Sequence, residues 1–434
     1  MLSSSADARS PQATGLDLRP FRALTYRRRD PEHLARVSSP AYDLVTPASR
    51  DRLADADPHN IVRLILPGVE PARDGDAEPA MRSAARSART LQTWRDEGVL
   101  ERDDAPAFWL YELRPAGAPP TIGWLGAVGL PAAGSRAVLP HEDTYPVAVE
   151  GRRALLAATE TDLEPIVLAH DPDPAIAELT RWAQQSPPVL ELEDDDGVRH
   201  RLWRVTAPAE IGSLTEAFAR TGAVIADGHH RFAAAQAHAR ASAGRPGDDA
   251  ILALLTPMGP GGLRVEAIHR VVPDLALDEA TRRAAKGFRV GALPGDTSVV
   301  ETAGRWLADP TATGFLLTDG ARVVQVSEPS AEVSAAVPPE APAAWRRLDV
   351  VLAHHGLFGH LWGRPDEPSS VLVAHDVPEA LRLATERGGT AVLLHAPSPA
   401  DVAAVAREGA RMPRKSTLFV PKPRTGLVLR PHEG

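Results

Sequence analysis

The sequence contains no cysteine among its 434 residues. This absence excludes disulfide bonds, catalysis by a thiolate and every zinc site built on cysteine ligands. It is compatible with the reducing conditions of the cytosol, and we predict a cytoplasmic protein.

Long apolar runs are also lacking. Residues 1–17 are polar and have no apolar segment of the kind found in signal peptides, so we interpret them as a disordered leader. No run of about 18 apolar residues occurs, and such a run is needed for a membrane-spanning helix. The sequence therefore predicts no membrane partner.

The sequence also has no excess of basic residues. It contains 48 Lys and Arg and 57 Asp and Glu, which gives a net charge of −9. This balance argues against a nucleic-acid footprint spread over the surface. The most basic stretches, residues 27–29 and 412–424, do not have the pattern of a recognition helix. We expect no nucleic-acid partner.

The length and the hydrophobic pattern predict two folded domains after the leader, at residues 18–274 and 275–434. The first combines a buried strand at 61–66, a helix at 79–97 and paired strands at 108–113 and 121–130. The second alternates helices and strands. The expected fold class is α/β (mixed α+β), with the second region forming a C-terminal α/β domain.

The clearest chemical motif is Asp227-Gly228-His229-His230-Arg231, between a short predicted strand at 223–226 and a predicted helix at 232–243. A helix start presents backbone N–H groups and a partial positive charge, which suit a phosphate. Glycine permits close approach of the backbone, and arginine binds phosphate in bidentate fashion. The alternative interpretation is a helix cap with solvated histidines.

A second polar cluster contains His141, Glu142 and Thr144. A carboxylate beside a histidine and a hydroxyl group can serve acid–base chemistry or hold Mg²⁺. An ordinary surface loop has the same composition, and the residues alone do not decide between the two.

Lys415, Ser416 and Thr417 form the Lys-Ser/Thr pattern of many phosphate sites, but they lack the glycine-rich lead of a P-loop. The alternative is a basic turn before a strand. We predict that these residues fold back onto the Asp227 loop.

Taken together, the motifs resemble a known family, the bacterial and archaeal proteins grouped as domain of unknown function 1015. The resemblance extends over almost the whole chain from Leu18. The matching segments are Arg19-Pro20-Phe21-Arg22-Ala23-Leu24, Pro40-Ala41-Tyr42-Asp43, Asn60-Ile61-Val62-Arg63-Leu64, Leu139-Pro140-His141-Glu142-Asp143-Thr144, Ala226-Asp227-Gly228-His229-His230-Arg231, His269-Arg270, Met412-Pro413-Arg414-Lys415-Ser416-Thr417, Pro421-Lys422 and Thr425-Gly426-Leu427.

The Asp227–Arg231 motif also resembles the loop of ADP-dependent free serine kinases, which belong to the ParB/sulfiredoxin-like superfamily. This resemblance implies a ParB/sulfiredoxin-like N-terminal core with insertions and a loop that grips nucleotide phosphates. It also implies a requirement for Mg²⁺ and an upstream glutamate that acts as base. Glu142 is the candidate for that role by its position. Sulfiredoxin chemistry needs a cysteine, which this chain lacks.

The chain departs from the family pattern at two points. Gly151-Arg152 stands where the family usually has Asp-Arg, and Asp162-Leu163 stands where it usually has Asn-Leu. If either pair lines the site, then the choice of substrate is in doubt.

The leading hypothesis is a nucleotide-dependent phosphotransferase that uses ADP or ATP with Mg²⁺ and acts on a small hydroxylated metabolite such as free L-serine. Catalysis is assigned to Glu142, Asp227 and His230, and the metal to Asp227 and Glu142. The predicted phosphate and nucleotide contacts are Gly228, His229, His230, Arg231, His141, Thr144, Lys415, Ser416 and Thr417. The alternatives are a nucleotide-binding (CTP or ATP) regulatory switch and a structural protein with a vestigial site. Assembly as a homodimer is left open.

Overall fold

The computed structural model describes residues 15–68, 79–242, 245–293, 297–309, 311–365, 367 and 369–432. Residues 1–14 of the expected leader lie outside this range. The chain divides into two compact units, Met1–Leu263 with Pro421–Gly434 as unit 1 and Arg264–Val420 as unit 2. Residues 421–434, which the sequence analysis grouped with the C-terminal domain, are thus counted with unit 1. Both units combine helices with sheets, which confirms the predicted mixed α/β class.

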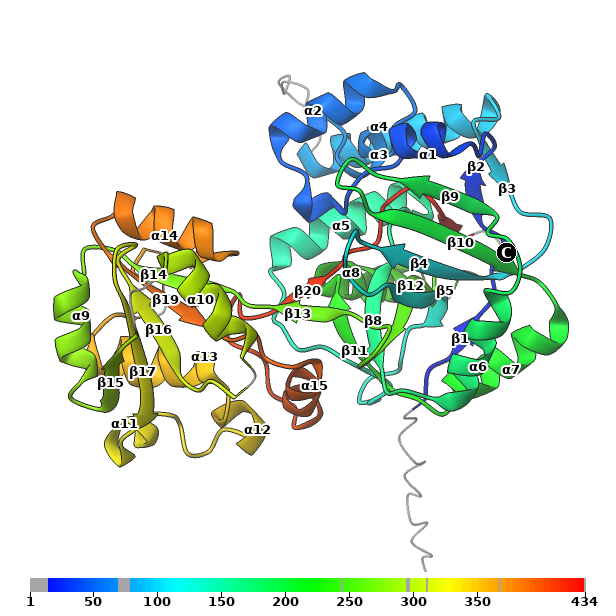
Figure 1. Cartoon of the computed structure of the whole chain (residues 1–434). Helices are drawn as coiled ribbons and strands as arrows, with labels where there is room; N and C mark the ends of the chain where they lie inside the picture. Colours follow the sequence, from blue (N-terminus) through cyan, green and yellow to red (C-terminus); the bar gives the residue numbers. More distant parts are fainter. Residues whose placement is uncertain are drawn as a thin grey trace, which may run out of the picture. The chain divides into compact units, whose positions relative to one another are not determined.

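A large mixed sheet forms the centre of unit 1 (Figure 1). Among the described residues its strand order is β6-β11-β8-β12-β5-β4-β10-β9, and β1 pairs with β5. β11 pairs with β6 and β12 with β8 in parallel, whereas the other pairs are antiparallel. The strands are β1 (Leu18–Arg19), β4 (Phe108–Arg114), β5 (Thr121–Gly129), β6 (Val138–Leu139), β8 (Ile166–His170), β9 (Leu190–Glu193), β10 (Arg199–Val205), β11 (Ala223–Asp227) and β12 (Ala250–Pro257).

Both faces of this sheet are buried. Successive side chains of a strand point to opposite faces, so neighbouring residues of one strand pack into different apolar clusters. In β4, Trp109 and Tyr111 belong to one apolar cluster, whereas Phe108 and Leu110 belong to the other. The first cluster includes residues of α1 (Pro31–Val37), α3 (Val62–Ile65) and α4 (Pro79–Asp96). The second includes residues of α6 (Pro174–Ala183), α7 (Pro208–Phe218) and α8 (His229–Ala241). Helices therefore cover the two faces of the sheet.

Shorter elements complete unit 1. Two small two-stranded sheets join segments that are distant in the sequence. One pairs residues 24–26 with residues 100–102, and the other pairs residues 161–162 with residues 430–431 of the C-terminal segment. These elements are β2 (Leu24–Tyr26), β3 (Leu100–Arg102), β7 (Thr161–Asp162), β21 (Arg430–Pro431), the 3₁₀ turn η1 (Tyr42–Leu44), α2 (Pro47–Ala56) and α5 (Pro146–Thr159).

One prediction in unit 1 was wrong. Residues 61–66 were predicted as a buried strand, but they form the short helix α3. The cause is Asn60, whose side-chain oxygen accepts the Val62 N–H at 2.9 Å and whose amide donates to the carbonyls of Arg36 and Ser38. This buried asparagine thus fixes the turn that precedes α3, and its long-range contacts override the strand propensity of the apolar run.

Unit 2 has its own six-stranded sheet among the described residues, in the order β15-β17-β16-β19-β14-β18, with all pairs antiparallel. A separate pair, β13 with β20, joins its first and last residues. The strands are β13 (Arg264–Glu266), β14 (His269–Val272), β15 (Phe288–Ala292), β16 (Phe315–Thr318), β17 (Val323–Pro329), β18 (Leu372–Ala374), β19 (Thr390–Leu394) and β20 (Leu418–Val420).

The helices of unit 2 are α9 (Leu277–Ala284), α10 (Val299–Ala308), α11 (Ala331–Ala335), α12 (Ala343–Arg346), α13 (Asp349–Leu352), the π-helix η2 (Ala353–Leu361), α14 (Val377–Glu386) and α15 (Pro399–Arg407). Within the described ranges, no helix of either unit is long and apolar enough to span a bilayer.

Candidate functional site

The Asp227–Arg231 motif forms the predicted joint between a strand and a helix. β11 ends at Asp227, and α8 begins at His229. Gly228 has φ = 94°, a left-handed conformation that L side chains rarely adopt. A Cβ atom at this position would also lie 2.7 Å from Cγ2 of Ile166. Both conformation and space therefore require glycine here.

Arg231, in the first turn of α8, turns back onto the strand end. Its Nη2 donates to Oδ2 of Asp227 at 2.5 Å, and its Nη1 donates to the carbonyl of Pro165 at 2.7 Å. Its Nε is buried and has no hydrogen-bond partner among the described residues. The guanidinium group is thus fixed in place with one donor still available.

Lys422, from the C-terminal segment of unit 1, binds the other oxygen of Asp227. The ammonium group lies 2.7 Å from Oδ1 of Asp227 and also contacts the carboxylate of Asp43. The Lys422 side chain is only 8% exposed, so this charge is held inside the protein. Asp227 is consequently clamped between two cations.

Burial raises the pKa of Asp227, but the charges of Arg231 and Lys422 outweigh burial and hold this pKa below its ordinary value. Burial also lowers the pKa of Lys422, yet Asp227 and Asp43 raise it above its usual range. Asp227, Arg231 and Lys422 are therefore charged at neutral pH, and together they form a network of ion pairs.

Glu164 and Tyr42 extend the network on the other side of Arg231. The Oε1 atom of Glu164 accepts the Tyr42 N–H at 3.1 Å and the Thr425 hydroxyl at 3.0 Å. The guanidinium of Arg152 lies 3.8 Å from the centre of the Tyr42 ring, and that of Arg231 lies 5.5 Å from it. The aromatic ring thus contacts two cations.

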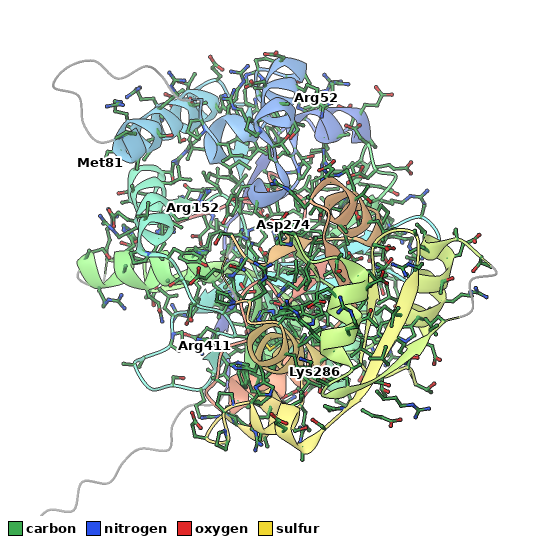
Figure 2. All side chains as sticks on the ribbon, turned by 90° about the vertical axis from the view of Figure 1, so that its left-hand side faces the viewer. Arg52, Met81, Arg152, Asp274, Lys286 and Arg411 are labelled. Carbon is green, nitrogen blue, oxygen red and sulfur yellow. The ribbon has the colours of Figure 1, made fainter. Side chains whose placement is uncertain are left out.

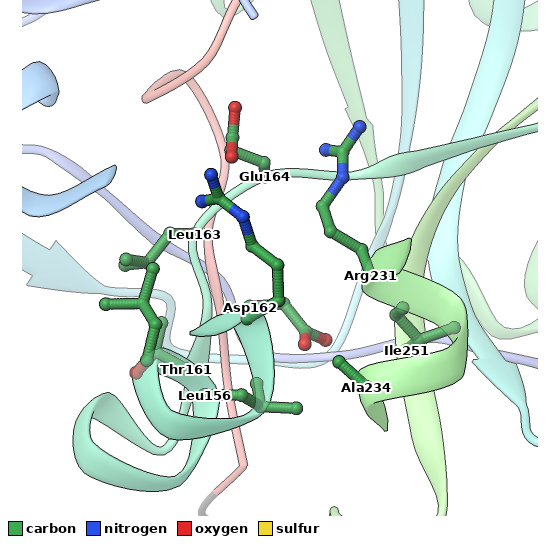
Figure 3. A pocket seen from close by; sticks show the side chains of 10 residues that line it. Leu156, Thr161, Asp162, Leu163, Glu164, Arg231, Ala234 and Ile251 are labelled. Atoms are coloured by element: carbon green, nitrogen blue, oxygen red, sulfur yellow. The ribbon is translucent and has the colours of Figure 1, made fainter. Parts of the chain in front are cut away.

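Two cavities in unit 1 adjoin these residues. The smaller, of about 50 Å³, is lined by Arg152, Glu164 and Arg231 among others, and Figure 3 shows the last two side chains on the same side of it. The larger, of about 560 Å³, is lined mostly by apolar residues together with Tyr42, Arg50 and Arg152. Arg152 lies on α5 (Figure 2) and lines both cavities. The larger volume is within the range of small-ligand sites.

The two predicted polar clusters meet at the histidines. The His141 N–H donates to Nε2 of His229 at 3.2 Å, and the two imidazole rings pack edge to face. Glu142 lies 4.0 Å from Nδ1 of His229 and 3.9 Å from Nε2 of His141. Its side chain is 36% exposed, so it faces solvent beside a buried pair of rings.

His230 points to a different neighbour. Its Nε2 accepts the Tyr145 N–H at 3.1 Å, and the two rings stack at 5.8 Å between centres. Thr144, the remaining predicted contact of the His141 cluster, is exposed. The structure therefore brings His141, Glu142, His229 and His230 into one neighbourhood at the start of α8.

Lys415, Ser416 and Thr417 lie in unit 2, whereas the Asp227 loop lies in unit 1. The prediction that they meet stays a prediction. Within unit 2 the Ser416 hydroxyl donates to the carbonyl of Pro413 at 2.6 Å, which holds a turn before β20.

The two departures from the family pattern have different settings. Gly151 lines the larger cavity, and a Cβ there would meet nothing within 4 Å, so a larger residue would fit. Asp162 is buried and binds Arg430 at 2.7 Å. Burial raises the pKa of Asp162, but Arg430 and His432 lower it more, so its carboxylate is charged and pairs with the C-terminal segment.

The sequence analysis assigned no role to Asp43, Glu164 or Lys422, although two of them stood in the family segments. Their distance from Asp227 along the chain hid them, because a cluster assembled from four segments has no local pattern. One signal in the sequence could have indicated a role for Lys422. It is a charged residue between Pro421 and Pro423, and two prolines at this spacing disfavour a helix.

Comparison with known proteins gives one family match, "Protein of unknown function (DUF1015)", over residues 18–351. No curated protein matches the chain in sequence. The solved structures that are similar in part include a free serine kinase in complex with AMP, SbnI with C-terminal truncation from Staphylococcus aureus, and a conserved hypothetical protein from Pyrococcus furiosus.

The free serine kinase is 16% identical to this chain, with a TM-score of 0.29, and the alignment covers 65% of this chain and 84% of that structure. SbnI is 10% identical, with a TM-score of 0.35 and coverage of 70% and 85%. The Pyrococcus furiosus protein is 16% identical, with a TM-score of 0.29 and coverage of 65% and 87%. At such low scores the likeness carries no argument about function, which has to come from the site itself.

Proposed function

Because the chain belongs to the DUF1015 family, whose description names no activity, we propose a function from the site: a nucleotide-dependent kinase of a small hydroxylated metabolite, such as free L-serine. The observation that carries the proposal is the convergence of Arg231, Lys422 and the start of α8 on one strand end. Tyr42, whose ring contacts Arg231, lines a ligand-sized cavity. A helix start with two cations suits the phosphates of a nucleotide.

In this proposal, Arg231 and Lys422 exchange part of their contact with Asp227 for contact with phosphate oxygens. The proposal assigns the Nε donor of Arg231 to the ligand, because no protein group satisfies it among the described residues. Phosphoryl transfer depends mainly on positioning and charge stabilisation, and these groups provide both.

Glu142 is the proposed base. Its carboxylate accepts the proton of the acceptor hydroxyl, whose oxygen attacks the terminal phosphorus while the bond to the bridging oxygen breaks. The Glu142 side chain is partly exposed beside His141 and His229, so a soluble substrate can reach it. His230, stacked on Tyr145, is a positioning residue of the same loop.

Mg²⁺ would neutralise charge on the phosphates when it is bound with the nucleotide. The two predicted ligands fit this role unequally. Both oxygens of Asp227 contact cations, so Asp227 does not fit as a ligand in this arrangement. Glu142 fits better because its carboxylate is partly open to solvent.

The alternative is a nucleotide-binding switch without transfer to a metabolite. It is favoured by the ion pairs of Arg231 and Lys422, because a phosphate that displaces Asp227 would rearrange the C-terminal segment that carries Lys422. Such a rearrangement could be sensed by a partner.

The test is incubation of the purified protein with Mg²⁺, L-serine and ADP, ATP or CTP in turn, with phosphoserine and nucleotide turnover measured by mass spectrometry. We expect phosphoserine with one donor and a rate about 100-fold lower in Arg231→Ala, the order of loss for one donor that stabilises transferring charge. Glu142→Gln should abolish transfer while nucleotide binding remains.

Arg204→Ala is the matched control, since Arg204 is a half-buried arginine of unit 1 that pairs with Asp103 and Asp104 away from the loop. Arg231→Lys keeps the charge and separates a folding defect from a lost contact. Turnover of nucleotide without phosphoserine would favour another acceptor or the switch. Absence of both binding and turnover would refute the proposal.

A further inference from the structure

Three metal-ligating side chains converge at the far end of α8, away from the phosphate loop. His238 lies in the last turns of α8, Asp248 precedes β12, and His432 follows β21. One nitrogen or oxygen of each lies within 4.8 Å of the others, and all three residues are buried. Two imidazoles and a carboxylate are ligands typical of zinc.

The distances fit a shared ion. Nε2 of His238 lies 3.4 Å from Oδ2 of Asp248. Two ligands about 2.0 Å from a tetrahedral zinc ion lie about 3.3 Å apart, which is close to this separation. Nδ1 of His432 lies 2.6 Å from Oδ1 of Asp248, which is a hydrogen bond that an ion would replace.

His238 provides a second, independent observation. Its side chain is only 7% exposed, and its Nε2 makes no hydrogen bond among the described residues, although Oδ2 of Asp248 lies 3.4 Å away. A buried polar atom without a partner is costly, and natural proteins rarely leave one unsatisfied. A metal ion in contact with this nitrogen would remove that cost.

The outer contacts also have the form of a metal site. Nε2 of His432 faces Oδ1 of Asp162 at 3.4 Å, and the other oxygen of Asp162 accepts the Leu252 N–H. A carboxylate on the second nitrogen of a histidine orients the ring toward a metal at the first. His432 thus lies between two carboxylates, of which Asp162 is also paired with Arg430.

One cation competes for the same carboxylate. Nε of Arg245 lies 3.1 Å from Oδ2 of Asp248. The Arg245 side chain is 46% exposed and also pairs with Glu160 at 2.6 Å, so it can keep that partner when an ion takes its place on Asp248.

We propose that His238, Asp248 and His432 bind a divalent ion of the zinc class, with water as the fourth ligand. The ion takes the place of the Nδ1 proton of His432, which leaves to solvent, so that one proton is released for each ion bound. The bound ion fastens the C-terminal segment, which also carries Lys422, to the end of α8. This inference does not depend on the proposed kinase activity.

The test uses the full chain, freed of metal with a chelator, and measures Zn²⁺ binding by titration calorimetry in two buffers of different ionisation enthalpy. We expect one ion per chain and release of one proton, together with visible absorption of tetrahedral Co²⁺ when Co²⁺ replaces Zn²⁺. His238→Ala should weaken binding at least tenfold, since even loss of an outer contact costs that much.

His375→Ala is the matched control, because His375 is a half-exposed histidine beside a carboxylate, Glu379, in unit 2. It should leave Zn²⁺ binding unchanged. His238→Gln, which keeps the size of the side chain, replaces His238→Ala if the latter does not fold. Equal Zn²⁺ binding by the His238 and His375 variants, or no binding by the unmodified chain, would overturn the proposal.

Discussion

Lys422 shows how a single side chain completes the candidate site. It is one of three lysines in the chain, with Lys286 and Lys415. Its ammonium group joins Asp43 and Asp227, which are far apart in sequence, and it is almost fully buried. A buried charge needs partners, so each of the three groups depends on the others for its stability.

Lys422→Met should therefore lower the free energy of unfolding of unit 1 by about 3 kcal/mol, because it leaves Asp227 with one cation fewer in a buried site. Denaturant titration followed by tryptophan fluorescence measures this change. The exposed Lys286→Met should change stability by less than about 0.5 kcal/mol.

The double variant Lys422→Met with Asp227→Asn should recover part of the loss, since the unpaired charge is then removed. Additive effects of the two substitutions would contradict the coupling between Lys422 and Asp227.

At the scale of elements, the joint between β11 and α8 is set by one glycine. Gly228 combines a positive φ with a close approach to Ile166. Gly197, in the turn between β9 and β10, has φ = 72° but open space around it. Substitutions at Gly228 and Gly197 therefore distinguish the cost of backbone strain, present at both, from the cost of steric conflict, present only at Gly228.

We expect Gly228→Ala to destabilise unit 1 by more than Gly197→Ala, which should cost about 1 kcal/mol for its strained backbone alone. Gly228→Ala should also abolish nucleotide binding, because the start of α8 must shift away from Ile166. Thermal unfolding and equilibrium binding of the nucleotide measure the two effects. Equal losses of stability at both glycines would contradict the role of the close contact.

Regular elements were predictable wherever a local pattern decided them. The hairpin of β4 and β5 follows from two apolar runs separated by turn residues, helix α4 from a proline at its start, and the joint at Asp227 from a glycine between a strand and a helix. α3 was not predictable, because the side chain of Asn60 binds carbonyls more than 20 residues away. The positions of Asp43, Glu164 and Lys422 depend in the same way on contacts between distant segments.

On the scale of the whole chain, the second unit contains its own buried family segment. His269 and Arg270 lie on β14, where Nδ1 of His269 accepts the Leu394 N–H at 3.3 Å and Arg270 donates to the carbonyl of Arg414 at 2.9 Å. Both are almost fully buried. Within unit 2 these residues hold strands and the turn before β20 together.

Burial, and then the charge of Arg270, lowers the pKa of His269 to about 4 from its ordinary value of 6.5. The unfolded chain therefore binds a proton at a higher pH than the folded chain does. The stability contributed by neutral His269 is complete above pH 6.5 and is lost as the pH falls towards 4.

This shift predicts a loss of about 3 kcal/mol in the free energy of unfolding of unit 2 over that range. Urea titrations at a series of pH values measure it. His269→Gln should flatten the pH dependence by that amount. An unchanged pH profile in the variant would assign the loss to other groups.

The order of elements along the chain has a consequence for biosynthesis. Most of unit 1 precedes unit 2 along the chain, but Lys422, Thr425 and Arg430 follow the whole of unit 2. Domains fold as units during synthesis, at about 5–20 residues per second. Until unit 2 has been translated, Asp227 of the nascent first unit has Arg231 but lacks Lys422, and Asp162 lacks Arg430. Residues made after unit 2 complete the first unit, so a chain released at the end of unit 2 would carry a finished second unit and an incomplete first one.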